Sequence, residues 1–263
     1  MERKKKAWIS GIFLILTLVV NGLGAVGFIN GLSQKEVSDL YPTLITPSPS
    51  TFGIWSVIYG LIILTVIMMI IKHDDHYYGK AIDKISSLFW LSSGLNMLWI
   101  VLFAYNLIFL STVVIFALLL TVIFIVKGVG QLQTQRRFLL PVTFGLYSGW
   151  LMIATVVNIT LWLVKIQWTG FGISPEVWAI IILLISVVLT GVVLLDIKNG
   201  IFPLPIAWAY FGIYNNLLSP DGYNNQYSVL PYVALLGSAL LIGLAAIQLY
   251  KNRYCSMPIK KEY

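Results

Sequence analysis

The sequence predicts an all-α fold: a polytopic bundle of about eight transmembrane helices in a lipid bilayer. Of the 263 residues, 59% are hydrophobic and only 10% are charged. In a soluble domain, about 25% of the residues carry charge. The mean hydropathy is +0.88. Several separate apolar runs reach about 20 residues, the length at which a helix crosses a bilayer. No soluble domain is expected.

The apolar runs place the helices in order along the chain. The first run exceeds the roughly 7–15 apolar residues of a signal peptide, so it is expected to remain as a helix. A short break at Tyr105-Asn106 separates the third helix from the fourth, and Pro203 and Pro205 interrupt the start of the seventh. The predicted helices cover about residues 7–29, 53–72, 85–106, 108–127, 139–164, 176–196, 201–217 and 230–250.

The basic residues predict the orientation of the bundle. With Met1 inside, all 17 Lys and Arg residues except Lys35 and Lys165 lie in inner segments. This distribution follows the positive-inside rule and predicts that both termini are cytoplasmic. A multi-pass protein of the plasma membrane is expected. The net charge of +7 is explained by this orientation and does not indicate a nucleic-acid partner.

Few residues outside the helices indicate chemistry. The inner-loop run His73-Asp74-Asp75-His76 could ligate a metal, although consecutive polar residues on a loop are more often simply solvated. The single cysteine, Cys255, excludes an intrachain disulfide and a thiolate metal cluster. The chain has no phosphate-binding glycine loop, no HExxH pair and no nucleophile elbow. No metal and no cofactor are predicted.

Two stretches place tryptophan and asparagine inside apolar helices. In the fifth predicted helix, Trp150, Ala154, Asn158 and Trp162 recur every four residues and therefore share one side. The third helix holds a second stretch, Gly94-Leu95-Asn96-Met97-Leu98-Trp99. Indole and carboxamide groups gain nothing from contact with lipid. Their alignment on one stripe, with a small alanine between them, is typical of the wall of a ligand pocket.

These stretches resemble the motifs of the tryptophan-rich sensory protein / translocator protein (TspO/MBR) family over about residues 7–165. Trp55-Ser56-Val57-Ile58-Tyr59 is similar to W-x-x-L-Y, and Leu95-Asn96-Met97-Leu98-Trp99 matches L-N-x-x-W. Tyr147-Ser148-Gly149-Trp150 matches Y-x-x-W, and the run from Ala154 to Asn158 is similar to A-T-x-L-N. The proline that the family usually has before Trp55 is absent. No aromatic residue follows Asn158, so the sterol-recognition pattern often cited there is missing.

Family members typically have five helices, so this chain resembles an enlarged variant. The resemblance divides it into a TspO-like five-helix membrane core, residues 1–165, and a three-helix C-terminal membrane extension with a basic tail, residues 166–263. It also implies one cavity in the outer half of the core for a flat hydrophobic ligand such as a tetrapyrrole. The expected ligand-binding residues are Trp55, Tyr59, Asn96, Trp99, Trp150, Ala154 and Asn158.

Structural interpretations of the same residues stay open. Asn96 and Asn158 could simply hydrogen-bond across helices, as is expected for Asn21. Trp168 and Trp178 are expected to be interfacial anchors, and Trp162 fits an anchor as well as a pocket wall. On the last helix, the small residues of the segment from Ala234 to Gly243 suit packing within the chain, with a homodimer face as the alternative.

The function favoured by the sequence is that of a membrane sensor or binding protein for a planar hydrophobic ligand. The alternatives are a passive transporter or permease for a small molecule and a purely structural membrane partner. No Asp, Glu, Lys, Arg or His lies deep in a predicted helix. Coupled carriers usually need such a group, and hydrolysis needs a general acid, a general base or a metal. An enzyme is therefore not expected.

Overall fold

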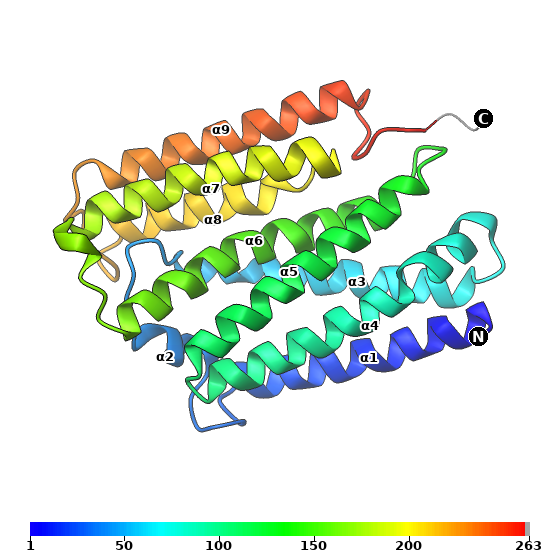
Figure 1. The fold of residues 1–263 in the computed structure, drawn as a ribbon, viewed down its shortest axis with the longest axis horizontal. Helices are drawn as coiled ribbons and strands as arrows, with labels where there is room; N and C mark the ends of the chain where they lie inside the picture. The colour runs from blue at the N-terminus through cyan, green and yellow to red at the C-terminus, as the bar shows by residue number, and fades with distance from the viewer. Residues whose placement is uncertain (261–263) are drawn as a thin grey trace.

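In the computed structural model, which describes residues 1–260, the chain is a bundle of long helices without a strand in that part (Figure 1). This confirms the predicted polytopic helical membrane fold. The elements are α1 (Arg3–Ala25), α2 (Gln34–Asp39), η1 (Pro49–Gly53), α3 (Ile54–Ile71), α4 (His76–Ala104), α5 (Ile108–Gln131), α6 (Leu139–Lys165), η2 (Gly170–Gly172), α7 (Pro175–Ile197), α8 (Pro203–Leu218) and α9 (Leu230–Lys251).

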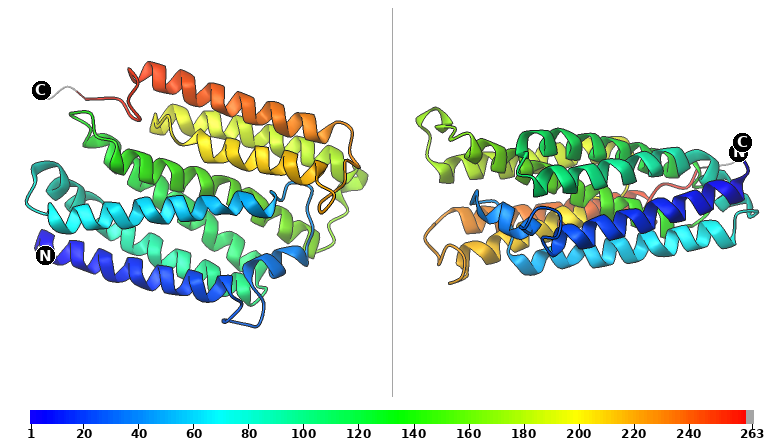
Figure 2. Two further views of the ribbon diagram at one scale, coloured as in Figure 1. Left: turned by 180° about the vertical axis from the view of Figure 1, so that it is seen from behind. Right: turned by 90° about the horizontal axis from the view of Figure 1, so that it is seen from below.

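The bundle has two distinct ends. Both termini lie at one end, together with the short connections from α3 to α4, α5 to α6 and α7 to α8 (Figure 1). We call this the termini end. The longer connections, including residues 26–53 and 219–229, lie at the opposite end, called here the long-loop end. Figure 2 shows the same arrangement from behind and from below.

The last three helices pack onto the first part of the chain through α8, which contacts α6 as well as α9. Phe202, Ile206 and Tyr210 belong to the same buried apolar cluster as Trp150 and Leu151. The hydrophobic core is therefore continuous across residue 165. The division into two units at that residue stays a prediction.

Specific residues set the helix ends. The Asp75 carboxylate caps α4 by accepting hydrogen bonds from the backbone N–H groups of Tyr77 and Tyr78, at 2.9 and 3.0 Å. Asn106, with φ 58°, adopts the left-handed conformation between α4 and α5. Pro203 occupies the first position of α8, where its missing N–H is tolerated.

Several predicted boundaries were wrong by four residues or more, and two of them have a clear physical reason. The third predicted helix was expected to begin near residue 85, but α4 begins at His76. Its polar first turns are stabilised by the Asp75 cap and by ion pairs of Asp83 with Arg3 and Lys6, both at 2.7 Å. Helix α1 ends at Ala25 rather than near residue 29, because the chain turns through Gly27 at φ 73°.

Seven helical segments of the described part are long and apolar enough to cross a membrane, against about eight predicted. The remaining long helix, α8, has 16 residues. At 1.5 Å per residue its length is about 24 Å, less than the roughly 30 Å hydrocarbon core. Pro203 shortens it, since residues 198–202 form a turn before the helix begins.

The charge pattern separates the two ends. Among the described residues, every Lys and Arg except Lys35 and Lys165 lies at or near the termini end; Lys261 lies outside the described residues. Among the described helices, the Asp, Glu, Lys, Arg and His side chains furthest from a helix end are Asp83 and Lys84, in the third turn of α4. The early start of α4 therefore brings into the helix two charged residues that were predicted to lie outside it.

Candidate functional site

A cavity of about 780 Å³ opens at the long-loop end of the bundle. Five of the seven predicted ligand-binding residues line it: Trp55 from α3, Trp99 from α4, and Trp150, Ala154 and Asn158 from α6. The three α6 residues lie one turn apart, so they form one wall. The volume is within the roughly 300–1,000 Å³ typical of small-molecule sites.

Trp55 is the centre of an aromatic cluster at this cavity. Its ring centroid lies 6.4 Å from that of Trp99 and 6.2 Å from that of Trp150. Phe52 approaches Trp150 edge-on at 5.8 Å, and Phe103 lies 6.1 Å from Trp99. Edge-on and tilted pairs of this kind are favourable, so the rings hold each other in fixed orientations. They give the cavity flat, largely apolar walls.

Asn158 is both a lining residue and a link between helices. Its Oδ1 accepts hydrogen bonds from the Trp99 indole N–H at 3.4 Å and from the Ser111 hydroxyl at 3.3 Å. Its Nδ2 donates to the Ala154 carbonyl at 3.0 Å. The amide is 4% exposed, so the protein satisfies most of its hydrogen-bonding capacity. Asn158 therefore borders the cavity and also links α6 to α4 and α5 through its hydrogen bonds.

Trp150 differs from Asn158 because it has a free donor. The side chain is 2% exposed, and its buried indole N–H has no hydrogen-bond acceptor among the described residues. A buried donor without a partner is unusual in a folded protein and costs free energy. A ligand in the cavity that carries an acceptor atom would be able to satisfy it.

The sequence profile of the TSPO-like protein family matches residues 7–247. The chain belongs to this family. The match includes α7, α8 and most of α9, so it extends well beyond residues 7–165, on which the motif resemblance was based. Comparisons with curated proteins and with solved structures gave no match.

In this TSPO-like chain, two predicted site residues lie outside the cavity lining. Asn96 is fully buried: its Oδ1 accepts from the Asn21 amide at 2.6 Å, and its Nδ2 donates to the Tyr147 hydroxyl at 3.3 Å. Tyr59 lies one turn beyond Trp55 on α3 and stacks on it at 5.3 Å. Both residues support the aromatic cluster from beneath and do not border this cavity, so their contact with a ligand stays a prediction.

The other tryptophans of the long-loop end also have structural partners. Trp162 continues the α6 stripe, but it packs on Phe109 at 5.0 Å and does not line the cavity. Four-residue spacing advances slightly beyond one helical turn, so a stripe rotates away from its starting face. Trp178 donates to the Gly170 carbonyl at 2.8 Å and packs on Trp168 at 4.9 Å.

Sequence reasoning missed the segments that cover the cavity. Residues between Gln34 and Phe52 line one side of its opening, and Asn216, Ser219, Asp221, Gly222 and Tyr223 line another. Neither segment has helical periodicity that points to a site. The length of the first was a usable signal, because long loops in compact domains are often binding loops or lids.

The covering segment is held in place by α8. The Ser48 N–H donates to the Gly212 carbonyl, and the Asn216 amide donates to the Thr46 carbonyl, both at 3.0 Å. The Trp208 indole N–H donates to the Thr51 carbonyl at 2.9 Å. These bonds join parts of the chain more than 150 residues apart. Helix α8 and the loop that follows it thus complete the cavity.

Charged side chains occur only at the opening of the cavity. Lys35 forms an ion pair with Asp39 there, whereas Asp221 has no ion-pair partner among residues 1–260. Nearby, Ser33 and Glu36 form a capping box at the start of α2. The hydrogen bonds from Ser33 lower the pKa of the Glu36 carboxyl. With one base and two acids, the opening is weakly negative.

The metal interpretation of residues 73–76 has no support in the structure. Within the described part of the chain, no group of three or more His, Cys, Asp or Glu side chains is placed to hold an ion. Asp75 caps α4, and the Nδ1 atom of His73 lies 3.0 Å from the Ile70 carbonyl. Solvation and capping account for this polar run.

Proposed function

We propose that this TSPO-like protein binds a flat, mostly apolar ligand such as a tetrapyrrole in the long-loop cavity and acts as a membrane sensor or binding protein. The observation that carries the proposal is the single cavity at which Trp55, Trp99, Trp150, Ala154 and Asn158 meet. Residues from three different helices converge there, although the sequence motifs that contain them are far apart.

The chemistry of the walls supports a planar ligand. Rigid indole rings present flat apolar surfaces, against which a conjugated ring system stacks favourably. The free Trp150 N–H favours a ligand with an acceptor, such as an imine-type ring nitrogen or a carbonyl oxygen. Hydroxyl groups at the opening, including those of Ser38 and Ser48, suit the polar edge of such a molecule.

The floor of the cavity favours binding over passage. Beneath it, Asn21, Asn96 and Tyr147 form a hydrogen-bonded layer between α1, α4 and α6. Further toward the termini end, the hydroxyls of Thr65 and Thr143 are 3.0 Å apart and buried. Tightly packed polar contacts of this kind leave little room for a permeating molecule. A passive permease is therefore the less favoured function.

The lining also supports a binding protein rather than an enzyme. General acid–base catalysis needs a titratable side chain within hydrogen-bond reach of the reacting group. The deep part of the cavity is lined by aromatic, aliphatic and amide side chains, and the carboxylates lie at its opening. We further propose that the termini end faces the cytoplasm, because the basic residues collect there, and that the membrane is the plasma membrane.

The homodimer alternative finds less support than packing within the chain. Ala234 and Ser238 of α9 are buried, and the Ser238 hydroxyl donates to the Ala207 carbonyl of α8 at 2.9 Å. A Cβ added at Gly237 would lie 2.6 Å from the Tyr210 ring. These small residues therefore serve the contact between α8 and α9.

The proposal is tested by titrating the purified protein with protoporphyrin IX and following its tryptophan fluorescence. Wild type is compared with Ala154→Phe, which fills the cavity, and with Ile159→Phe as a matched control. Ile159 is on the same helix but is 40% exposed on the outside of the bundle. Saturable quenching is expected for wild type and for the control, with affinity weakened about tenfold or more, about 1.4 kcal/mol, in Ala154→Phe.

A third variant, Trp150→Phe, isolates the free donor. It keeps an aromatic wall but removes the N–H, and it is expected to weaken binding by about 0.5–1.5 kcal/mol. No saturable quenching in wild type would exclude the tetrapyrrole as ligand. Equal affinities for wild type and Ala154→Phe would remove the cavity from the binding site. Porphyrin flux across liposomes at a steady rate would favour the permease.

A further inference from the structure

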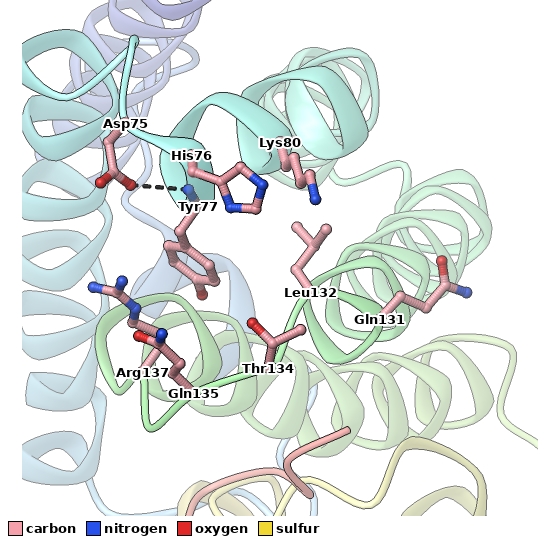
Figure 3. A pocket seen from close by; sticks show the side chains of 9 residues that line it. All are labelled: Asp75, His76, Tyr77, Lys80, Gln131, Leu132, Thr134, Gln135 and Arg137. Atoms are coloured by element: carbon pink, nitrogen blue, oxygen red, sulfur yellow. Dashed lines mark hydrogen bonds between the residues drawn. The ribbon is translucent and has the colours of Figure 1, made fainter. Parts of the chain in front are cut away.

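A second, smaller pocket of about 220 Å³ lies at the opposite end of the bundle. It is formed between the first turns of α4 and the segment 131–137, which connects α5 to α6 (Figure 3). Figure 3 shows the His76 ring and the Lys80 side chain extending from α4 over Leu132, while Gln131 points away. This pocket shares no lining residue with the long-loop cavity.

Two cationic side chains from different elements line this pocket. Lys80 comes from α4 and Arg137 from the α5–α6 connection. Neither has a carboxylate oxygen within 4.0 Å in the described part of the chain, although Arg137 interacts electrostatically with Asp75. The cations of the pocket are therefore available for an anion.

The one carboxylate in the lining has another role. Asp75 Oδ1 accepts the two backbone N–H groups at the start of α4, and the positive end of the helix dipole balances part of its charge. Hydroxyl and amide groups of Thr134 and Gln135 add neutral donors to the lining. A tetrahedral anion with several oxygen atoms is well suited to donors arriving from different directions.

The floor of the pocket is rigid. The Arg137 guanidinium lies over the Tyr77 ring at 5.0 Å, a cation–π contact that fixes its position. The buried Gln133 amide donates to the Tyr77 hydroxyl at 3.0 Å. The C-terminal tail adds a further tie, because the Lys260 N–H donates to the Gln133 carbonyl at 2.7 Å. Little reorganisation is needed when an anion binds.

We propose that this pocket binds a phosphate-bearing anion, either the headgroup of an anionic phospholipid or a soluble phosphate, between Lys80 and Arg137. Basic pockets between transmembrane helices are known to hold anionic headgroups. Phe138, the residue after Arg137 in the chain, has a side chain that is 57% exposed and offers apolar surface to a lipid. A lipid would be able to contact this surface as well as the two cations. This inference does not rest on the ligand of the long-loop cavity.

The test uses the purified full chain in a neutral detergent and isothermal titration calorimetry. Three probes are titrated separately: dihexanoyl phosphatidylglycerol, dihexanoyl phosphatidylcholine and inorganic phosphate. The pocket variant is Lys80→Gln with Arg137→Gln. The matched control is Lys4→Gln with Lys251→Gln, which removes two exposed positive charges from the same end of the bundle. Melting temperatures of both variants are measured alongside.

Wild type is expected to bind phosphatidylglycerol or inorganic phosphate. The affinity of the pocket variant for the same probe is expected to be roughly tenfold weaker or more. The affinity of the control variant should stay within about twofold of wild type. Binding of phosphatidylglycerol alone would identify the ligand as a lipid headgroup. Binding of inorganic phosphate as well would identify it as a soluble phosphate. The charge-preserving variant Lys80→Arg is expected to retain binding, and Lys80→Gln alone carries the test if the double variant does not fold.

Three results would overturn the proposal. The first is that neither phosphatidylglycerol nor inorganic phosphate binds to wild type. The second is equal loss in the pocket variant and the control, which would indicate diffuse attraction to a basic surface. The third is equally tight binding of the net-neutral phosphatidylcholine, which would show that net negative charge does not matter.

Discussion

Replacing Gly149 with alanine tests the close contact between α6 and α8 that completes the cavity. A Cβ at this position would lie 2.1 Å from the Phe202 carbonyl oxygen and 2.6 Å from Pro205 Cγ. An ordinary contact requires 3.4 Å or more, so the two helices must separate by about 1.3 Å. The obstacle is backbone at the start of a helix, which cannot rotate aside as a flexible side chain can.

The expected cost follows from two opposing effects. Overpacking of a well-packed interior costs typically about 1–3 kcal/mol. Replacement of glycine by alanine in a helix interior returns about 0.8–1.0 kcal/mol. A contact of 2.1 Å with backbone is severe, so the upper end of the overpacking cost applies, and the net loss of stability is expected to be about 2 kcal/mol. Since α8 also holds the segment over the cavity, porphyrin affinity should fall with it.

The matched control is Gly94→Ala in the interior of α4. A Cβ there meets no heavy atom within 4 Å, so only the gain in helix propensity remains. Thermal unfolding of both variants is followed through the fluorescence of the nine tryptophans. Gly149→Ala is expected to melt several degrees below wild type and Gly94→Ala at or above it. Equal melting temperatures for the two variants would refute the close approach of α6 and α8.

Three further predictions concern single polar side chains. Asn96→Ala removes the hydrogen bonds to Asn21 and Tyr147, so thermal melting should show a loss of about 0.6–2 kcal/mol in the free energy of unfolding. Porphyrin affinity should stay unchanged. A loss of affinity with no loss of stability would place Asn96 in the binding site. Asp221→Asn removes an unpaired negative charge at the cavity opening. A fluorescence titration at low salt should therefore show the dianionic porphyrin binding about two- to threefold more tightly than to wild type. In 1 M salt this difference should disappear, because the charges are screened. Asp75→Asn tests the pH dependence of the α4 cap. Hydrogen bonds from the backbone N–H groups of Tyr78 and Tyr77 lower the pKa of the Asp75 carboxyl. The charged carboxylate therefore stabilises the fold at a pH above the unfolded pKa of about 3.9, and this stabilisation is lost as the pH falls through the lower pKa of the folded state. Wild type should therefore melt above Asp75→Asn at pH 7, and the difference should shrink as the pH falls below about 3.9; a difference that stays constant from pH 7 down to pH 3 would contradict this account.

Several features of the protein follow from its sequence alone. The apolar runs and the scarcity of charge determine a membrane helix bundle, because a backbone in lipid must satisfy its own hydrogen bonds. The distribution of Lys and Arg separates the two ends. The motifs around Trp55, Trp99 and Trp150 identify three lining residues, since helical periodicity shows which side chains share a face.

Periodicity does not show which neighbour a face meets, and this limits the prediction of the site. Asn96 and Trp99 are three residues apart on one helix, yet Trp99 borders the cavity whereas Asn96 is bonded to Asn21 in the layer beneath. Trp162 shares the stripe of Trp150 but faces Phe109. The relative depth and rotation of packed helices decide these outcomes, and they arise from contacts among all of the neighbours.

Only the tertiary structure showed how the cavity is covered. The hydrogen bond from Asn216 to Thr46 joins residues 170 positions apart. The contact at Gly149 depends on the exact position of a turn at Phe202 more than 50 residues later in the chain. Neither segment has a repeating pattern, and loop conformations are set by the partners that satisfy their backbone groups. The sequence therefore determines the helices and which end of the bundle carries the basic residues, whereas long-range packing determines that α8 and the loop after it complete the site.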